Sequence, residues 1–225
     1  PDGSRRPLEG NPSGNYITMC IANPSFHQQI LKDWQKSPER NPENIPYRPH
    51  INACENDTPG MCCCELCRAW DASHPGFAEH PYWGKGQIPT NRGRFTLAGA
   101  SRDELAGDAS KIIVPSLSDR YARFYATLAK KVRQDNPDVK VAGYAYSNYY
   151  LPPVADDIDL SGVIISHVPP MGSRGGLGFP YTKQGSSNFR KSWEVWRRLG
   201  AEMLFRPNIL HFGANLPVFY ARQIA

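Results

Sequence analysis

The fold is decided by residues 50–67, which read HINACENDTPGMCCCELC. The first five residues form a short, largely apolar run that is typical of a buried strand. Two acids and an amide follow, then a Thr-Pro-Gly turn, and then four cysteines within six residues. Buried strands bring polar groups to their ends, where the chain leaves the core. This stretch is therefore either a reactive site or a strand end that is capped by acids.

Length and composition are those of a folded globular protein. The chain has 225 residues, of which 40% are hydrophobic and 21% are charged. No run approaches the ~20 apolar residues of a membrane span, so we expect no such segment. The net charge of +5 comes from basic residues that are scattered along the chain, which favours a solvated surface over a nucleic-acid partner. Because the chain begins at Pro1 without an initiator methionine, we expect it to be a piece of a longer protein.

Hydrophobic periodicity predicts strands that alternate with helices. A helix should start at Asn23-Pro24, an N-cap followed by proline at the first helical position, and should break near Pro38. The clearest helix should be capped by Ser118 and carries a continuous apolar stripe of Tyr121, Phe124, Tyr125, Leu128, Ala129 and Val132. A later helix contains Phe189, Trp193, Trp196 and Leu199 and ends at Gly200, which we expect to be a left-handed cap. The expected strands are residues 16–21, 50–54, 139–146, 160–168 and 201–205, and a last helix starts within residues 216–225.

This alternation requires parallel strands joined by right-handed crossovers. A (β/α)8 barrel and an open doubly wound sheet both fit the order. The chain has no dinucleotide fingerprint, and its glycine-rich loop at residues 172–178 lacks the ending of a phosphate loop. We therefore predict an α/β fold, a partial (β/α)8 TIM-like barrel. It would form one incomplete domain over residues 1–225, with a long loop insertion at about residues 68–117 and its first and last units outside the chain.

Active sites of parallel barrels lie where the strands end. The predicted strand ends are rich in acids, amides and phenols, which suit the hydroxyl groups and C–H surfaces of sugars. We predict Glu55 and Asp57 as a catalytic carboxylate pair. The candidate substrate-binding residues are Asn56, Tyr144, Tyr146, Asn148, His167, Arg206 and Asn208.

The spacing of the two acids is compatible with glycoside hydrolysis. Residues two apart on an extended strand point to the same side, with Cβ atoms about 6.6 Å apart. That separation serves a retaining or an inverting geometry. The alternative is that one acid caps the loop while the other is solvated. His167 has two equal alternatives, a substrate contact and a core residue, and the phenols of Tyr144 and Tyr146 share one face and could instead fill a barrel core.

Cysteines form the second unusual feature of the stretch. Cys62, Cys64 and Cys67 follow a C-x-C-x-x-C pattern, and Cys20 is expected at a neighbouring strand end. Together they could bind a structural zinc ion, or pair as disulfides in an oxidising compartment. A catalytic thiol is less favoured because no base is placed beside one. No other cofactor is indicated.

Four motifs, taken in order and spacing, resemble the DUF4838 family: Cys20-Ile21-Ala22-Asn23-Pro24, Glu55-Asn56-Asp57 with the cysteine pattern, Ser118-Asp119-Arg120-Tyr121, and Pro152-Pro153. The resemblance covers about residues 15–220. It implies a glycoside-hydrolase-like TIM barrel of largely bacterial proteins, often secreted or attached to the cell envelope. An extracellular or envelope location and an oligosaccharide or polysaccharide partner follow from that resemblance.

The same resemblance bears on the acids. The family is similar to the β-hexosaminidase and α-glucuronidase barrels, whose acid follows the fourth strand. By that likeness Asn56-Asp57 stands where those enzymes carry an acidic pair, and an amide replaces one acid here. We therefore expect a glycosidase with Asp57 as general acid and Glu55 as second carboxylate. The alternatives are a catalytically inactive sugar-binding barrel and a module braced by a metal or by disulfides.

Overall fold

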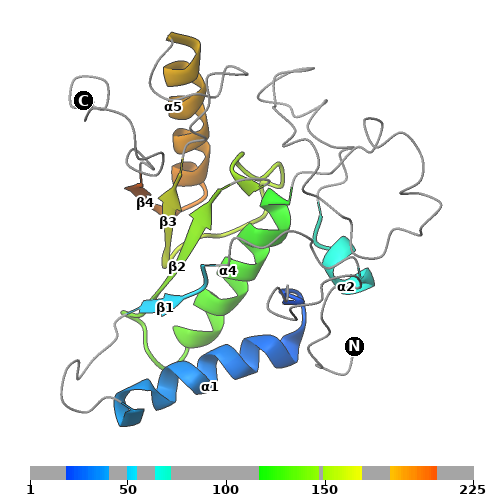
Figure 1. The fold of residues 1–225 in the computed structure, drawn as a ribbon, viewed down its shortest axis with the longest axis vertical. Helices are drawn as coiled ribbons and strands as arrows, with labels where there is room; N and C mark the ends of the chain where they lie inside the picture. The colour runs from blue at the N-terminus through cyan, green and yellow to red at the C-terminus, as the bar shows by residue number, and fades with distance from the viewer. Residues whose placement is uncertain are drawn as a thin grey trace, which may run out of the picture.

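The computed structural model of the chain describes residues 19–40, 50–54, 64–71, 117–146, 149–168 and 183–206. Within them, four parallel strands form one sheet, with helices packed against it (Figure 1). The elements are α1 (Pro24–Arg40), β1 (His50–Asn52), α2 (Glu65–Arg68), α4 (Ser118–Val132), β2 (Lys140–Ala145), β3 (Val163–His167), α5 (Lys183–Arg198) and β4 (Glu202–Phe205). The mixed α/β class predicted from the sequence is confirmed.

The strands lie side by side in chain order, β1-β2-β3-β4, and every neighbouring pair is parallel. Alternate residues of a strand face the same side of a sheet. One face carries Ile51, Val141, Val163 and Ile165, and none of these side chains is more than 1% exposed. We call it the helix face, because α4 and α5 cover it.

Helix α4 forms the centre of the core. All six residues of its predicted apolar stripe are buried, which confirms the periodicity. The prediction that Ser118 caps this helix is wrong: Leu117 occupies the cap position and Ser118 is the first helical residue. Asp119, in the first turn, accepts hydrogen bonds from the backbone N–H groups of Val154 and Ala155 at 3.0 and 2.8 Å. The first turn of α4 thus holds the segment between β2 and β3.

Helix α1 starts where the sequence places it. The side chain of Asn23 accepts a hydrogen bond from the Ser25 N–H at 2.9 Å, as an N-cap does. The helix continues to Arg40, so the expected break at Pro38 is wrong. Figure 1 shows α1 beside α4. The two helices pack through Phe26, whose ring centroid lies 6.1 Å from that of Phe124.

The remaining strands and caps follow the sequence closely. β2 and β4 match the predictions to within a residue, whereas β3 starts three residues later than expected. The cause is Gly162, whose φ of +82° makes a turn directly before the strand. Gly200 has a φ of +97° after α5, which confirms the left-handed cap.

The first expected strand is described only in part. Residues 19–21 are not in a strand, since Cys20 accepts a turn hydrogen bond from the Asn23 N–H at 3.0 Å. Residues 16–18, most of the loop insertion (72–116), the glycine-rich loop 172–178 and the last helix at 216–225 lie outside the described residues. No helix in the described part of the chain is long and apolar enough to cross a membrane.

Candidate functional site

The sheet face opposite α4 and α5 carries polar groups. By register and alternation its members are His50, Asn52, Cys54, Lys140, Ala142, Tyr144, Tyr146, Ile164, Ser166, Glu202, Leu204 and Arg206. We call this set the open face. Leu204 is 53% exposed on it, an unusual position for a leucine in a parallel sheet. The described helices therefore leave this face available to other groups.

Side chains from the ends of β4 and β1 hydrogen-bond to β2 near the carboxyl ends of the strands. The Arg206 guanidinium donates to the Tyr144 hydroxyl and also lies over its ring, with Cζ 4.8 Å from the ring centroid. The Cys54 thiol is close enough to the Tyr144 hydroxyl for each to shift the pKa of the other. Cys54 in turn donates to the backbone carbonyl of Ala142 at 3.7 Å. Side chains that follow β1 and β4 are thus joined through β2.

Backbone pairing beyond the formal strand ends holds these residues in place. The Ala53 N–H donates to the Ala142 carbonyl at 2.8 Å, and the Arg206 N–H donates to the His167 carbonyl at 3.0 Å. Beyond the end of β1, the hydroxyl of Tyr125 hydrogen-bonds the backbone groups of Tyr144 in place of a neighbouring strand. It donates to the Tyr144 carbonyl at 3.1 Å and accepts from the Tyr144 N–H at 3.2 Å.

The protonation states of Cys54 and Tyr144 fit ligand binding better than nucleophilic or base catalysis. Burial raises the pKa of the Cys54 thiol, although Tyr144 and Arg206 oppose the rise. Burial likewise raises the pKa of Tyr144, with Cys54 adding to it and Arg206 opposing it. Both groups are therefore protonated at neutral pH, so neither a thiolate nucleophile nor a phenolate base is present. The group offers hydrogen-bond donors, a cation and an aromatic ring face.

A second cluster lies apart from the sheet, between the start of α1 and the helix α2. The sulfur of Cys20 lies 3.5 Å from that of Cys64 and 3.6 Å from that of Cys67. Cys67 is fully buried and the other two are half-buried. The sequence prediction joined these three cysteines to Cys62, which lies outside the described residues.

A family model described as a domain of unknown function, DUF4838, matches residues 1–224. The chain belongs to the DUF4838 family. The resemblance drawn from the four sequence motifs is thereby confirmed. Comparison with curated proteins and with solved structures gives no match.

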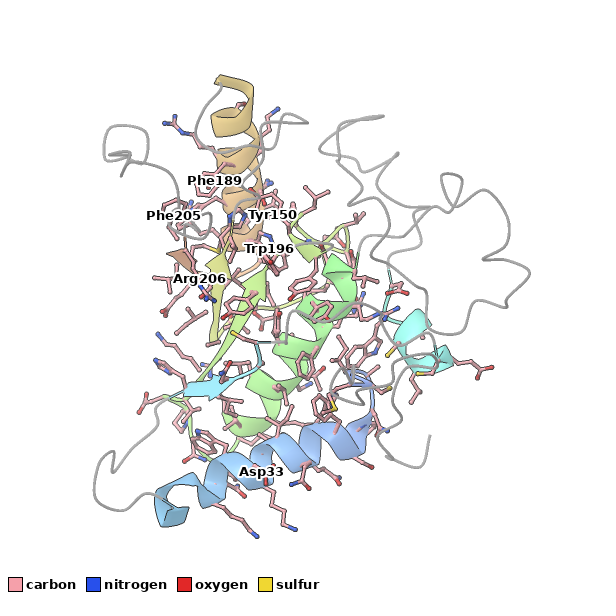
Figure 2. The ribbon with its side chains drawn as sticks, in the orientation of Figure 1. Asp33, Tyr150, Phe189, Trp196, Phe205 and Arg206 are labelled. Atoms are coloured by element: carbon pink, nitrogen blue, oxygen red, sulfur yellow. The ribbon has the colours of Figure 1, made fainter. Side chains whose placement is uncertain are left out.

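The DUF4838 chain brings together some of the predicted site residues. Tyr144, Tyr146 and Arg206 share the open face, and the two tyrosine rings meet edge to face with centroids 6.5 Å apart. Figure 2 shows Arg206 at the end of β4. The remaining predicted residues lie outside the described part of the chain: Glu55, Asn56, Asp57, Asn148 and Asn208.

His167 does not join the group. Its side chain is on the helix face and has no exposed surface. Nε2 lies 2.8 Å from the Ser192 hydroxyl, and the rings of Tyr150, Phe189 and Trp193 lie within 6.0 Å of the imidazole. Phe205 packs against Phe189 beside them (Figure 2). Of the two alternatives drawn from the sequence, the geometry fits a core residue.

Burial of His167 makes stability depend on pH. Burial lowers the pKa of its imidazole from 6.5 to about 3, and within the described residues Nδ1 has no partner that could stabilise a second proton. The unfolded chain therefore binds a proton that the folded chain excludes. The free energy of unfolding should fall as pH drops below 6.5, by up to ~1.4 kcal/mol per pH unit from this residue.

His167→Gln tests this coupling, because glutamine keeps a hydrogen-bonding group for Ser192 and does not titrate. Urea unfolding between about pH 6 and pH 5, above the range of ordinary carboxyl groups, should give a shallower slope for the variant than for the wild type. Equal slopes would show that His167 is protonated in the folded chain. His27, whose pKa is also lowered by burial, contributes equally to both proteins.

Sequence reasoning missed Cys54. It was counted among the cysteines and given no role in the site, yet its thiol hydrogen-bonds the Ala142 carbonyl of β2 and lies near the Tyr144 hydroxyl. The alternation of β1 carried the signal, since Cys54 is two residues beyond Asn52 and therefore on the same face. Pairing β1 with β2 in register was the step that the sequence did not supply.

Proposed function

We propose that the chain is a carbohydrate-active domain, a section of a (β/α)8 barrel that binds a glycan at its strand ends and hydrolyses a glycosidic bond. The single observation that carries the proposal is the convergence of Tyr144, Tyr146 and Arg206 on the open face. In folds built on parallel strands, ligands bind at the carboxyl ends of the strands, where these three residues lie. Aromatic faces and fork-shaped donors are the groups that bind sugar rings and their hydroxyl or carboxyl substituents.

The arrangement of the sheet supports a barrel section. In a doubly wound sheet the strand order reverses and helices cover both faces. Here the order runs β1-β2-β3-β4 without a reversal. Gly143 faces Tyr125 of α4 and His167 faces Ser192 of α5, and both residues lie on the helix face. Because α4 and α5 lie on one side of the sheet, the open face fits the interior of a barrel, which the strands of a full barrel would enclose.

Asp57 is the general acid of this proposal and Glu55 its second carboxylate. Both follow β1, the strand whose end carries Cys54 and whose neighbour carries Tyr144. A glycosidic oxygen needs a carboxylic acid to protonate it as the bond breaks. The tyrosines and Arg206 would hold the saccharide against the open face.

A second candidate is a barrel that binds sugars without cleaving them. Among the described residues, the carboxyl-end half of the open face contains no carboxylate; its members are Cys54, Tyr144, Tyr146, Ser166, Leu204 and Arg206. Glu202 is at the opposite end, paired with Lys140. The amide at Asn56 favours this candidate as well.

The positive charge of Arg206 indicates which class of saccharide should bind best. No carboxylate of the described residues pairs with the exposed guanidinium of Arg206, and its partner there is the neutral Tyr144. A carboxylate on the ligand would form a bidentate pair of charge-assisted hydrogen bonds with the Arg206 guanidinium. We therefore expect saccharides that carry uronic acids to be retained better than neutral ones.

A glycan array read by mass spectrometry separates the two candidates. The wild-type chain should retain a subset of saccharides and release shortened products from them. Asp57→Asn should retain the same saccharides, with product formation reduced at least ~100-fold, the lower range for loss of a general acid. Product formation that survives Asp57→Asn contradicts the assigned role, retention without products supports the binding candidate, and no retention of any saccharide contradicts both.

A further inference from the structure

The three sulfur atoms of Cys20, Cys64 and Cys67 converge on one point. All three lie within 4.8 Å of one another, and two of the separations are 3.5 and 3.6 Å. Four sulfur atoms around a zinc ion at ~2.3 Å would be about 3.8 Å apart along each edge of the tetrahedron. The observed separations are therefore close to those of three corners of a zinc site.

The chain supplies these corners from two segments that are far apart in sequence. Cys20 lies in the turn before α1, which is closed by the hydrogen bond from the Asn23 N–H. Cys64 has an extended backbone directly before α2, and Cys67 is inside that helix. A C-x-x-C pair that enters a helical turn brings two thiols to one side, as in structural zinc sites. Cys20 supplies the third from 44 residues away.

A disulfide explains this geometry less well than a metal ion does. A bond between two sulfur atoms is ~2.05 Å long and joins only two of the three residues. Cys20 is nearly equidistant from both others, so no pair is selected. The third thiol would be left beside a disulfide, whereas a metal ion uses all three.

We propose that Cys20, Cys64 and Cys67 bind a zinc ion as thiolates, with a structural role. The fourth position of the tetrahedron is completed by a further ligand or by water. Thiolates are the ligands that zinc prefers in structural sites, and three negative sulfur atoms so close together need a cation to offset their repulsion.

The surroundings explain why such an ion is needed. Helix α2 has four residues, too short to be stable alone. Among the described residues, the segment that follows it is held by the ring of Trp70, which stacks on His27 at 5.9 Å, and by Asp71, which pairs with Arg120. A metal bound to both α2 and the turn before α1 would fix the two segments against α4.

Metal content of the 225-residue chain tests the proposal. After purification under reducing conditions without chelators, the wild type should contain about one zinc ion per chain by elemental analysis. Replacement by Co²⁺ should give the thiolate-to-cobalt charge-transfer absorption and intense d–d bands of a tetrahedral site. X-ray absorption at the zinc edge should find three or four sulfur neighbours at ~2.3 Å.

Variants assign the ion to these residues. Cys20→Ser, in a turn and half-buried, should fold and lose most of the zinc, and Cys67→Ser should lose it as well. Cys54→Ser is the matched control, because its thiol hydrogen-bonds Ala142 on the open face, and it should keep the wild-type zinc content. Zinc that persists in Cys20→Ser, a shell of oxygen and nitrogen only, or a disulfide from Cys20 to Cys64 or Cys67 in metal-free protein would each overturn the proposal.

Discussion

Replacing Asp71 with alanine is expected to lower the free energy of unfolding by about 3–5 kcal/mol, the loss seen when one partner of a buried ion pair is removed. Both oxygens of Asp71 accept from Arg120, at 2.7 Å from Nε and 2.6 Å from Nη2. The side chain of Arg120 is 4% exposed and that of Asp71 is 13% exposed. Without the carboxylate, the guanidinium keeps its charge in a place that water hardly reaches. Urea unfolding followed by circular dichroism measures the loss.

An exposed pair provides the matched control. Glu194 and Arg197 lie one turn apart on α5, with both side chains more than half exposed. Glu194→Ala should change stability by less than ~1 kcal/mol, as is usual for surface pairs. The joint replacement of Asp71 and Arg120 by leucine and methionine should recover most of the loss. A similar effect at Asp71 and Glu194 would mean that Asp71 is solvated.

Gly143→Ala is expected to destabilise the chain by about 1–3 kcal/mol, the usual cost of overpacking a core. A Cβ atom at this position would lie 2.5–2.7 Å from three atoms of the Tyr125 ring. That ring cannot rotate away, because the side chain is fully buried and its hydroxyl hydrogen-bonds both the N–H and the carbonyl of Tyr144. The change should therefore also disturb Tyr144 on the open face.

A double-mutant cycle tests whether a clash with the Tyr125 ring causes the loss of stability in Gly143→Ala. In a Tyr125→Ala background the added methyl group has room, so Gly143→Ala should cost much less there than in the wild type. Ala142→Ser, one residue away and on the open face, should alter stability by less than ~0.5 kcal/mol. An equal cost of Gly143→Ala in both backgrounds would contradict the assigned clash.

Sequence periodicity predicted α1, α4 and α5 because each of them buries a single stripe, whereas the four-residue α2 has no such stripe and was not predicted. The stripe of α4, from Tyr121 to Val132, and the caps at Asn23 and Gly200 depend on contacts within a few residues. Ser118 was assigned as a cap by residue type, whereas the preceding backbone at Leu117 takes that position. The late start of β3 depends on the turn at Gly162, which the apolar pattern of the preceding residues conceals.

The sequence predicted which residues could form the candidate site, but not how they are arranged. Tyr144, Tyr146 and Arg206 were identified because strand ends of a parallel sheet gather at one edge. The role of Cys54 depends on the register between β1 and β2, and register is a long-range property. His167 also ends a strand and shares the face of Ile165, but strand alternation alone does not show that this is the face covered by α5. For Cys20, Cys64 and Cys67 the sequence suggested a cluster and the fold supplied the distances.

The most direct test of the account is the affinity of the chain for a saccharide that it retains, measured by calorimetry for two arginine variants. Arg206 lies on the open face and Arg197 lies on the surface of α5, away from it. Arg206→Ala should weaken binding at least ~10-fold, equivalent to ~1.4 kcal/mol, whereas Arg197→Ala should bind as the wild type does. Equal affinities for both variants would contradict the proposal that the open face binds the glycan.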